Sequence, residues 1–347
     1  MSRIIAIDAF LEQAKQTPVI DVRSPAEFVQ GHIPGAHNLP LFDNDERAEV
    51  GTLYKQRGRI PAVQRGLEIA GTKMRRFTDF ALRLQSAELL LYCWRGGMRS
   101  AAMAWLFETI DIRCNLLEHG YKAYRNHLLA SFSKPLRMVL LGGFTGSGKT
   151  EILNVLHAHG AQVLDLERIA NHKGSAFGGI GQAQQPTTEH FENLIAAQCA
   201  QIDPNQTLYI EDESKNVGRC SIPPAFWEQM RRAPLICIQT PRPVRTERLM
   251  REYAGFDTDL LCEAIQKIEK RLGFDRCKEA TAACLRGERQ TALEICLHYY
   301  DKAYANQLHE RFGPEWERHL PQFTPHFPLD AEQMETLVSI NVFTYPY

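Results

Sequence analysis

Short runs of consecutive apolar residues recur along the chain, separated by longer segments whose apolar positions have helical spacing. In the first part of the chain, the runs at residues 18–22, 89–92 and 114–117 have the length and the flanking turn residues of buried strands. The run at 89–92 leads into a glycine-rich loop, and a helix is predicted from about residue 100 to 109. Alternation of strand, loop and helix favours a parallel α/β sheet.

A second series of strands follows residues 131–135, which have the character of a linker. Strands are predicted at residues 138–141, 161–164, 207–210 and 235–238, with helical patterns between them. From 244 to about 308 the pattern is mostly helical and rich in charge, and a late strand is predicted at 337–343. A length of 347 residues suits two domains. We expect one at residues 1–134 and the other, with a helical extension, at 135–347.

Composition and charge restrict the class of protein further. Apolar residues make up 44% and charged residues 23% of the chain, as in ordinary globular proteins. No apolar run is long enough to span a membrane and the N-terminus lacks a signal-peptide pattern, so a cytoplasmic location without a membrane partner is expected. The net charge of −1 does not indicate a tight, non-specific nucleic-acid binder. Clustered basic residues can still act locally.

The nine cysteines form no recognisable framework. Their number is odd, their spacing is scattered and no Cys-x-x-Cys occurs, which argues against both a disulfide scaffold and a zinc site. Most are expected to be small buried side chains. A functional cysteine must therefore be identified by its local sequence.

Cys93 has such a local sequence, because it begins a loop between a predicted strand and a predicted helix. Backbone N–H groups in a loop of this kind form an anion-binding nest, and the positive end of the following helix adds to it. Both stabilise a thiolate, so Cys93 is a candidate nucleophile, and Arg99 can pair with an oxyanion. The remaining residues of this expected anion loop are Trp94, Arg95, Gly96, Gly97, Met98 and Ser100. The alternative is a buried structural cysteine before a turn.

A second motif begins at Gly143 and matches G-x-x-x-x-G-K-[ST] in the required setting, after a strand and at the start of a helix. Backbone N–H groups of this loop hold phosphates, Lys149 contacts terminal phosphate oxygens, and Thr150 can bind Mg²⁺. The phosphate-binding candidates are Gly143, Gly146, Ser147, Gly148, Lys149 and Thr150. The motif predicts binding of a di- or triphosphate but does not by itself predict hydrolysis of ATP.

Acidic residues follow two of the strands predicted beside this loop. They are candidates for metal or substrate contacts, and the pattern does not decide among them: Asp165, Glu167, Glu211, Asp212 and Glu213. The three adjacent acids at 211–213 make the metal contact ambiguous, and one or two of them could simply be solvated.

The first part of the chain resembles the rhodanese family. The segments that carry the resemblance are DVRSPAEF at 21–28, GHIPGA at 31–36 and EHGYKAY at 118–124, where a second glycine would be more usual than His119. The resemblance implies that the loop cysteine carries sulfur or selenium, and that His32 is more often structural than a ligand or base. The loop is one residue longer than in most sulfur-carrying rhodaneses. Cys-x5-Arg-Ser is also a phosphatase signature, and a larger loop suits a phosphate ester or a selenophosphate.

A rhodanese-like domain joined to a P-loop domain resembles the bacterial tRNA 2-selenouridine synthases over essentially the whole chain. Matching segments are GTLYK at 51–55, CWRGGMRS at 93–100, DLE at 165–167, HKGSAFG at 172–178, QPT at 185–187 and ESKNVG at 213–218. The resemblance implies an N-terminal rhodanese-like parallel sheet with helices and a C-terminal P-loop NTPase-like α/β domain with a helical extension.

The same resemblance implies a reaction on 2-thiouridine at the wobble position (U34) of the tRNAs for Lys, Glu and Gln. Geranyl diphosphate first alkylates the sulfur, and selenophosphate then supplies selenium, with Cys93 as the candidate selenium carrier. We expect these two co-substrates and no tightly bound organic cofactor. We also expect the protein to be a monomer. Arg245, Arg248 and Arg251 fall on one helical face and are candidates for contacts with the tRNA backbone or the donor's phosphates.

Two other functions remain open at this point. One is a rhodanese-fold phosphatase fused to a small-molecule kinase-like domain, in which Cys93 hydrolyses a phosphoester. The other is a non-catalytic nucleotide-binding regulator with Cys93 as a redox sensor.

Overall fold

The computed structural model describes residues 2–340, which divide into two compact units. Unit 1 comprises residues 1–132 together with 192–197, and unit 2 comprises 133–191 and 198–347. Each contains a five-stranded parallel sheet, which confirms the predicted α/β class. Within the described residues, no helix is both long and apolar enough to cross a membrane.

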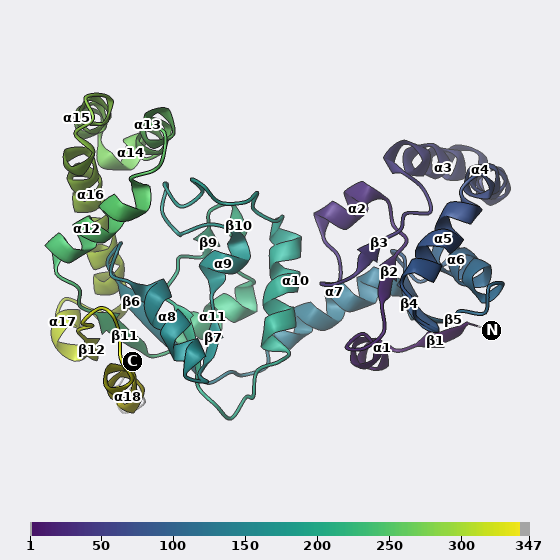
Figure 1. The fold of residues 1–347 in the computed structure, drawn as a ribbon, viewed down its shortest axis with the longest axis horizontal. Coiled ribbons are helices and arrows are strands. Elements are labelled where there is room, and N and C mark those ends of the chain that lie inside the picture. Colours follow the sequence, from purple (N-terminus) through teal and green to yellow (C-terminus); the bar gives the residue numbers. More distant parts are fainter. Residues whose placement is uncertain (1, 341–347) are drawn as a thin grey trace. The chain divides into compact units, whose positions relative to one another are not determined.

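Unit 1 has the strand order β1-β5-β4-β2-β3 (Figure 1). Its strands are β1 (Arg3–Ile5), β2 (Val19–Asp21), β3 (His37–Asn38), β4 (Glu88–Tyr92) and β5 (Arg113–Leu117). Its helices are α1 (Ile7–Gln13), α2 (Pro25–Gln30), α3 (Asn44–Arg57), α4 (Arg59–Gly71), α5 (Met74–Arg83), α6 (Met98–Glu108) and α7 (Gly120–Ser131). The central strand β4 is buried from Leu89 to Tyr92, as its continuous apolar run predicts.

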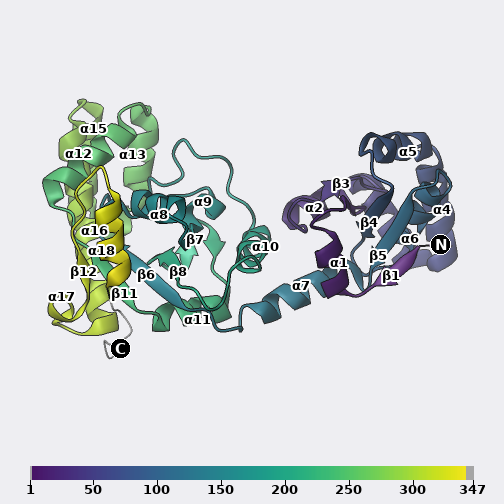
Figure 2. The same cartoon turned by 60° about the horizontal axis from the view of Figure 1, so that its bottom comes forward.

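Unit 2 has the strand order β12-β11-β6-β8-β7, with the P-loop strand β6 in the middle (Figure 2). The strands of this sheet are β6 (Met138–Gly143), β7 (Gln162–Leu164), β8 (Leu208–Glu211), β11 (Leu235–Ile238) and β12 (Gln322–Phe323). A separate two-stranded ribbon consists of β9 (Asn216–Val217) and β10 (Cys220–Ser221). Because the parallel strands β6, β7 and β8 end at one edge of the sheet, the loops that follow them lie close together.

The helices of unit 2 are α8 (Lys149–Ala158), α9 (Leu166–Ala170), α11 (Pro224–Arg232), α12 (Arg242–Tyr253), α13 (Thr258–Lys267), α14 (Glu269–Leu272), α15 (Phe274–Leu285), α16 (Arg289–Phe312), α17 (Trp316–His319) and α18 (Ala331–Ser339). Helix α10 (Thr188–Cys199) contributes residues 192–197 to unit 1. The segment from α12 to α16 confirms the predicted helical extension, and α13, α15 and α16 enclose an apolar core of their own, separate from the core on the sheet.

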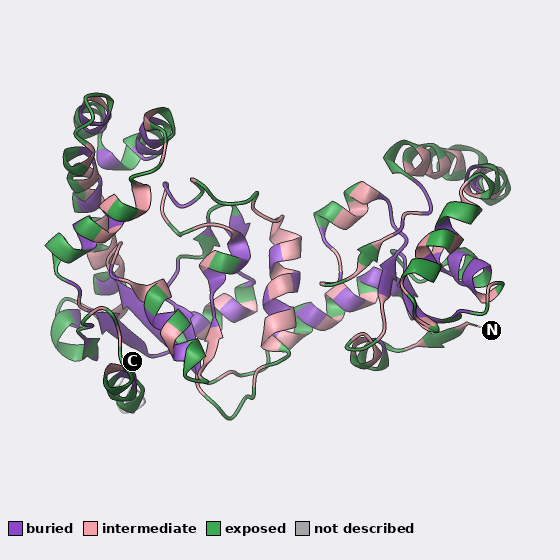
Figure 3. Cartoon of the chain, in the orientation of Figure 1, coloured by how far each residue is buried: buried purple, intermediate pink, exposed green. Residues whose placement is uncertain are grey.

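Burial follows the apolar pattern closely: the strands β4, β6 and β11 are buried along most of their length, whereas α3 has no buried residue (Figure 3). The late strand predicted at 337–343 is wrong for its first residues. Residues 337–339 end helix α18, where Leu337 is buried against the sheet, and residues 341–343 lie outside the described part of the chain. An apolar run at the end of a helix cannot be told from a strand by its length alone.

Candidate active site

Cys93 lies at the point where β4 ends and the loop before α6 begins, as the sequence predicts. Its side chain is buried, and its Sγ accepts hydrogen bonds from the Gly97 N–H at 3.2 Å and the Ser100 hydroxyl at 3.3 Å. Burial alone would raise the pKa of the Cys93 thiol, but the hydrogen bonds from Ser100 and Gly97 and the charge of Arg99 outweigh it and lower the pKa. The site therefore stabilises a thiolate.

Four of the other cysteines have a different character. Burial in apolar surroundings raises the pKa of four of them to about 12: Cys114, Cys199, Cys237 and Cys296. These thiols stay protonated at neutral pH, so Cys93 differs from them chemically as well as in position.

The loop is clamped onto the start of α7. The N–H groups of Tyr121 and Lys122 donate to the carbonyls of Cys93 and Trp94, at 2.8 and 3.1 Å. Gly96 has φ +65°, and a Cβ there would lie 2.9 Å from the backbone of Leu117 and His119, so only glycine fits. His119 itself has φ +57°, a conformation that favours glycine, which explains why glycine is more usual at this position.

Arg99 is held by a carboxylate. Its guanidinium pairs with Glu27 at 2.7 and 3.4 Å. Burial would raise the pKa of the Glu27 carboxyl, but Arg99 and the Ser24 N–H lower it, so the pair is ionised. Arg99 thus contributes positive charge near Cys93 while its fork is occupied by Glu27.

The loop between Cys93 and Arg99 is exposed to solvent. Trp94 is 38% exposed and Met98 is 53% exposed, and Arg95, Gly96 and Gly97 are also exposed. The guanidinium of Arg59, at the start of α4, lies 3.9 Å from the Met98 sulfur. A substrate reaching Cys93 therefore meets an apolar and basic rim.

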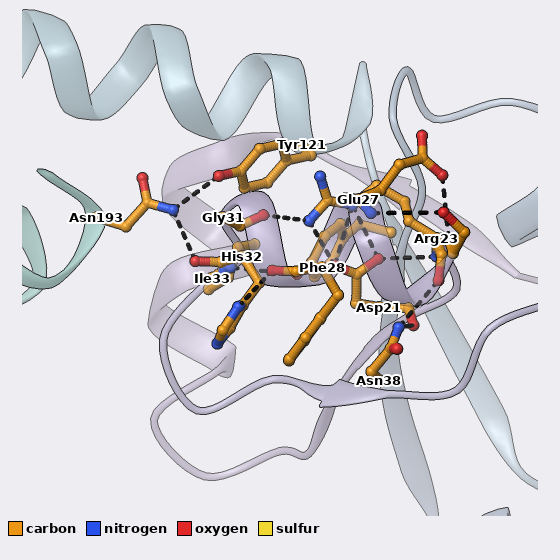
Figure 4. A network of polar contacts seen from close by, with 12 residues as sticks. Asp21, Arg23, Glu27, Phe28, Gly31, His32, Ile33, Asn38, Tyr121 and Asn193 are labelled. Atoms are coloured by element: carbon orange, nitrogen blue, oxygen red, sulfur yellow. Dashed lines mark hydrogen bonds and ion pairs between the residues drawn. The ribbon is translucent and has the colours of Figure 1, made fainter. Parts of the chain in front are cut away.

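A buried ion pair between Asp21 and Arg23 lies at the end of β2 (Figure 4). Asp21 and Arg23 are both fully buried and bonded through two guanidinium nitrogens, and Arg23 also donates to the Gly31 carbonyl at 2.6 Å. The guanidinium carbon lies 3.8 Å from the centroid of the Tyr121 ring and 5.9 Å from that of Trp94. The pair thus connects strand β2 to the cysteine loop and to α7.

His32 belongs to the same network. Its Nδ1 lies 2.9 Å from the Phe28 carbonyl and its ring stacks on Phe28 at 3.7 Å. Burial lowers the pKa of His32, so the imidazole is neutral at physiological pH. Its backbone carbonyl accepts from Asn193, which also donates to the Tyr121 hydroxyl (Figure 4). Packing accounts for this histidine.

In unit 2, the P-loop runs from β6 into α8, in the predicted setting. Lys149 Nζ donates to the Gly143 carbonyl at 3.1 Å, and the Thr150 hydroxyl donates to Glu167 at 3.4 Å. Gly146 and Gly148 have φ of +79° and +88°, and a Cβ at either would collide with α12 side chains. The curled loop therefore requires these glycines.

The five acids predicted near the P-loop are brought together at the ends of β7 and β8, with separate contacts. Asp165 caps α9 by accepting from the Arg168 N–H at 2.7 Å, and Glu211 accepts from the Leu166 N–H at 3.2 Å. Asp212 pairs with Arg311 at 3.0 Å and accepts from the Tyr304 hydroxyl at 3.0 Å.

Glu167, which accepts a hydrogen bond from Thr150, is in contact with Glu213. Burial and the neighbouring charge of Glu213 raise the pKa of Glu167 to about 8, and burial raises the pKa of Glu213 as well. Two carboxyls in contact repel each other when both are ionised, so they share a proton at neutral pH. Within residues 2–340, no three His, Cys, Asp or Glu side chains are arranged as a metal site. Thr150 and one carboxylate fit Mg²⁺ only when phosphate oxygens complete the shell.

The three arginines of α12 do not share one environment, although their spacing places them on one broad helical face. Arg245 is 4% exposed, pairs with Asp301 at 2.9 and 2.8 Å and donates to the Thr145 carbonyl at 3.1 Å. Arg248 pairs with Glu151 at 2.7 Å and lies against Gly148, whereas Arg251 is a surface residue near Glu247.

Arg245 is therefore too deep to reach an RNA backbone. Its buried guanidinium binds the P-loop backbone at Thr145. A glutamate at this position would face Asp301 and disturb the loop. Arg248 lies beside the phosphate-binding backbone, which leaves the donor-phosphate alternative for this arginine.

Comparison with known proteins follows the division of the chain. A rhodanese-like domain model matches residues 7–127, and a model described as the tRNA 2-selenouridine synthase AAA domain matches residues 136–286. The chain is 35% identical to the tRNA 2-selenouridine synthase of Verminephrobacter eiseniae, over 85% of this chain and 90% of that one. It is also 35% identical to the synthase of Bdellovibrio bacteriovorus, over 85% and 89%. The chain belongs to the tRNA 2-selenouridine synthase family.

A solved rhodanese-related protein from Thermoplasma volcanium is also similar, at 17% identity and a TM-score of 0.23, over 36% of this chain and 92% of that one.

In this member of the tRNA 2-selenouridine synthase family, sequence reasoning missed the residues that hold the two loops. Asp21, Arg23 and Glu27 lie inside the segment that carries the rhodanese resemblance. That segment does not indicate that Asp21 and Arg23 are fully buried or that Glu27 pairs with Arg99. The supports of the P-loop are on α16, far along the chain: Asp301 binds Arg245, and Tyr304 donates to Asp212 while its hydroxyl accepts from the Gly143 N–H at 2.9 Å. No local signal identifies them.

Proposed function

We propose that this chain is a tRNA 2-selenouridine synthase, which replaces the sulfur of 2-thiouridine at the wobble position of the tRNAs for Lys, Glu and Gln with selenium. The observation that carries the proposal is the combination, in a chain of this family, of a thiolate-stabilising loop at Cys93 with a complete P-loop. We further propose that residues 1–134 perform the selenium step and residues 135–347 the prenyl step.

In the first step, the sulfur of 2-thiouridine attacks C1 of geranyl diphosphate. A carbon–sulfur bond forms as the carbon–oxygen bond breaks, and the electron pair leaves with the diphosphate. The P-loop N–H groups and Lys149 bind the diphosphate and stabilise its developing charge. Thr150 would hold a Mg²⁺ ion, which would supply further positive charge when bound. The role of the P-loop in this step does not require ATP cleavage.

Alkylation makes the second step accessible, because a thiocarbonyl sulfur is a poor leaving group until it becomes a thioether. Cys93 takes selenium from selenophosphate: an S–Se bond forms as the Se–P bond breaks. The electron pair of the broken bond leaves with phosphorus as phosphite, so selenium is oxidised by two electrons and phosphorus is reduced by two. The terminal selenium then attacks C2 of the modified uridine and geranylthiolate leaves. Two thiol groups of a reductant finally cleave the S–Se bond and are oxidised to a disulfide, which frees 2-selenouridine and Cys93.

Mass spectrometry of tRNA nucleosides from cells with and without the gene for this chain tests the proposal. We expect 2-selenouridine to disappear from the deletion strain while 2-thiouridine remains, and to return when the gene is restored. Unchanged 2-selenouridine in the deletion strain would rule the function out. As a control for the phosphatase alternative, the purified chain should not hydrolyse a generic aryl phosphate.

A further inference from the structure

A broad groove opens in unit 2 beside the P-loop, with a volume of about 990 Å³. The segment after α9, the β9–β10 ribbon and the helices α13, α14 and α16 contribute its walls. It is separate from the P-loop motif itself. Its volume lies at the upper end of the range for ligand sites and is far larger than one small anion fills.

Unpaired cations lie along one wall. Lys267, Lys270 and Arg271 are exposed and line the groove, and none of them is in an ion pair within the described residues. Glu263 is the acidic residue among the described lining residues. Although the chain as a whole has a net charge of −1, this wall is locally positive. Positive charge that is not used in internal ion pairs is what a polyanion's backbone needs.

Aromatic and polar groups line the same groove. Tyr299 and Tyr300 are half-buried with ring centroids 5.1 Å apart, and the Tyr300 hydroxyl is fixed by accepting from the Ala176 N–H at 3.0 Å. Among residues 2–340, the buried Nδ1 of His172 has no hydrogen-bond partner. Single-stranded RNA is bound by stacking of its bases on aromatic rings and by hydrogen bonds to base edges, whereas an acidic peptide needs no aromatic platform.

One end of the groove meets the donor site. Gly174 lines the groove with φ +67°, and a Cβ there would lie 2.8 Å from Glu167 and 2.9 Å from Glu213. Glu167 in turn accepts from the hydroxyl of Thr150 in the P-loop. A base held in the groove therefore lies next to the position that a bound diphosphate occupies.

We propose that this groove binds the single-stranded nucleotides of the anticodon loop and presents the wobble base to the prenyl donor. Lys267, Lys270 and Arg271 contact phosphates, Tyr299 stacks on a base, and His172 bonds to a base edge. The proposal rests on the proposed function, because it takes tRNA as the substrate.

The test compares full-length variants in binding a fluorescein-labelled anticodon stem-loop RNA across a salt series. For K267E/K270E/R271E we expect at least about tenfold weaker binding near 0.1 M salt. The log–log salt slope should be shallower by about 2, because each lost single-strand phosphate contact removes roughly 0.7. The matched control R276E/K278E/K302E reverses three exposed cations on α15 and α16 that do not line the groove, and should keep the slope of the unmodified chain.

Tyr299→Leu adds an independent readout. It should weaken binding by about tenfold without changing the salt slope, because stacking releases no counterions. An unchanged affinity and slope in the triple variant, with geranyl diphosphate still bound, would overturn the groove proposal. So would equal competition by a polyglutamate peptide. If the unmodified chain makes no 2-selenouridine, the proposed function fails whatever the RNA-binding result; if it does, a failed binding test removes the groove alone.

Discussion

The fully buried Asp21–Arg23 pair should control the stability of the cysteine loop. Asp21→Asn preserves shape but leaves the Arg23 guanidinium uncompensated in a site where both side chains have no solvent exposure. Removing one partner of such a pair costs about 3–5 kcal/mol. A comparable change in a solvated pair costs at most about 1 kcal/mol. Glu49→Gln is the matched control, because Glu49 and Arg65 are 45% and 42% exposed.

Hydrogen exchange of the full-length protein measures this difference locally. Peptides that contain β2 and β4 should lose protection in Asp21→Asn by an amount equivalent to several kcal/mol, while peptides from β6 and β8 in unit 2 keep theirs. Asp21→Asn/Arg23→Met, which removes both charges, should recover part of the loss. Equal effects of Asp21→Asn and Glu49→Gln would refute the view that burial makes this pair important.

Three further predictions concern the proposed chemistry. Cys93→Ala should stop selenium transfer but leave prenylation intact, so that geranylated 2-thiouridine accumulates. Nucleoside mass spectrometry of a reaction with purified enzyme, both donors and thiolated tRNA measures this. If a folded Cys93→Ala makes neither product, assigning one step to each domain is wrong. Lys149→Ala should bind geranyl diphosphate at least about tenfold more weakly in isothermal titration, because a charge-assisted contact is lost, and unchanged affinity would remove the P-loop from this role. Ser100→Ala should raise the pKa of Cys93, because the thiolate loses a hydrogen bond while the thiol loses little. The rate of iodoacetamide alkylation at Cys93 rises with pH through this pKa, so its midpoint should move to higher pH in Ser100→Ala, and a midpoint at the same or lower pH would contradict the assignment.

The parts of the fold that sequence could predict are those with local causes. The buried runs gave the main strands of both sheets to within a residue or two, because a central parallel strand is apolar on both faces. Short edge strands such as β3 and β12 carry two residues each and leave no pattern to detect. A strand was expected where α18 ends, because a short apolar run has no period that would distinguish a helix from a strand.

Motif spacing likewise placed Cys93 directly after a strand and Lys149 at the start of a helix, because a strand–loop–helix turn is encoded within about ten residues. It could not separate the acids at 211–213. That separation comes from α16, where Tyr304 and Arg311 engage Asp212 and leave Glu213 to face Glu167. Contacts between residues about 100 positions apart decide which carboxylate is available, and one sequence does not contain them.

The sequence also does not show which basic residues are free to bind RNA. Arg245 and Lys267 are both cations in charge-rich helices of unit 2, and sequence gives more reason to select Arg245, which lies in the denser basic cluster. In the fold, Arg245 is neutralised by Asp301 and supports the P-loop, whereas Lys267 is exposed, without an ion pair among the described residues, and faces the groove. A cation can attract RNA only with charge that no internal carboxylate has already compensated. An RNA-binding surface is therefore better identified by unpaired cations that line a groove than by the density of basic residues. In the described part of this chain these two criteria together favour Lys267, Lys270 and Arg271 over the ion-paired Arg245, Arg248 and Arg251.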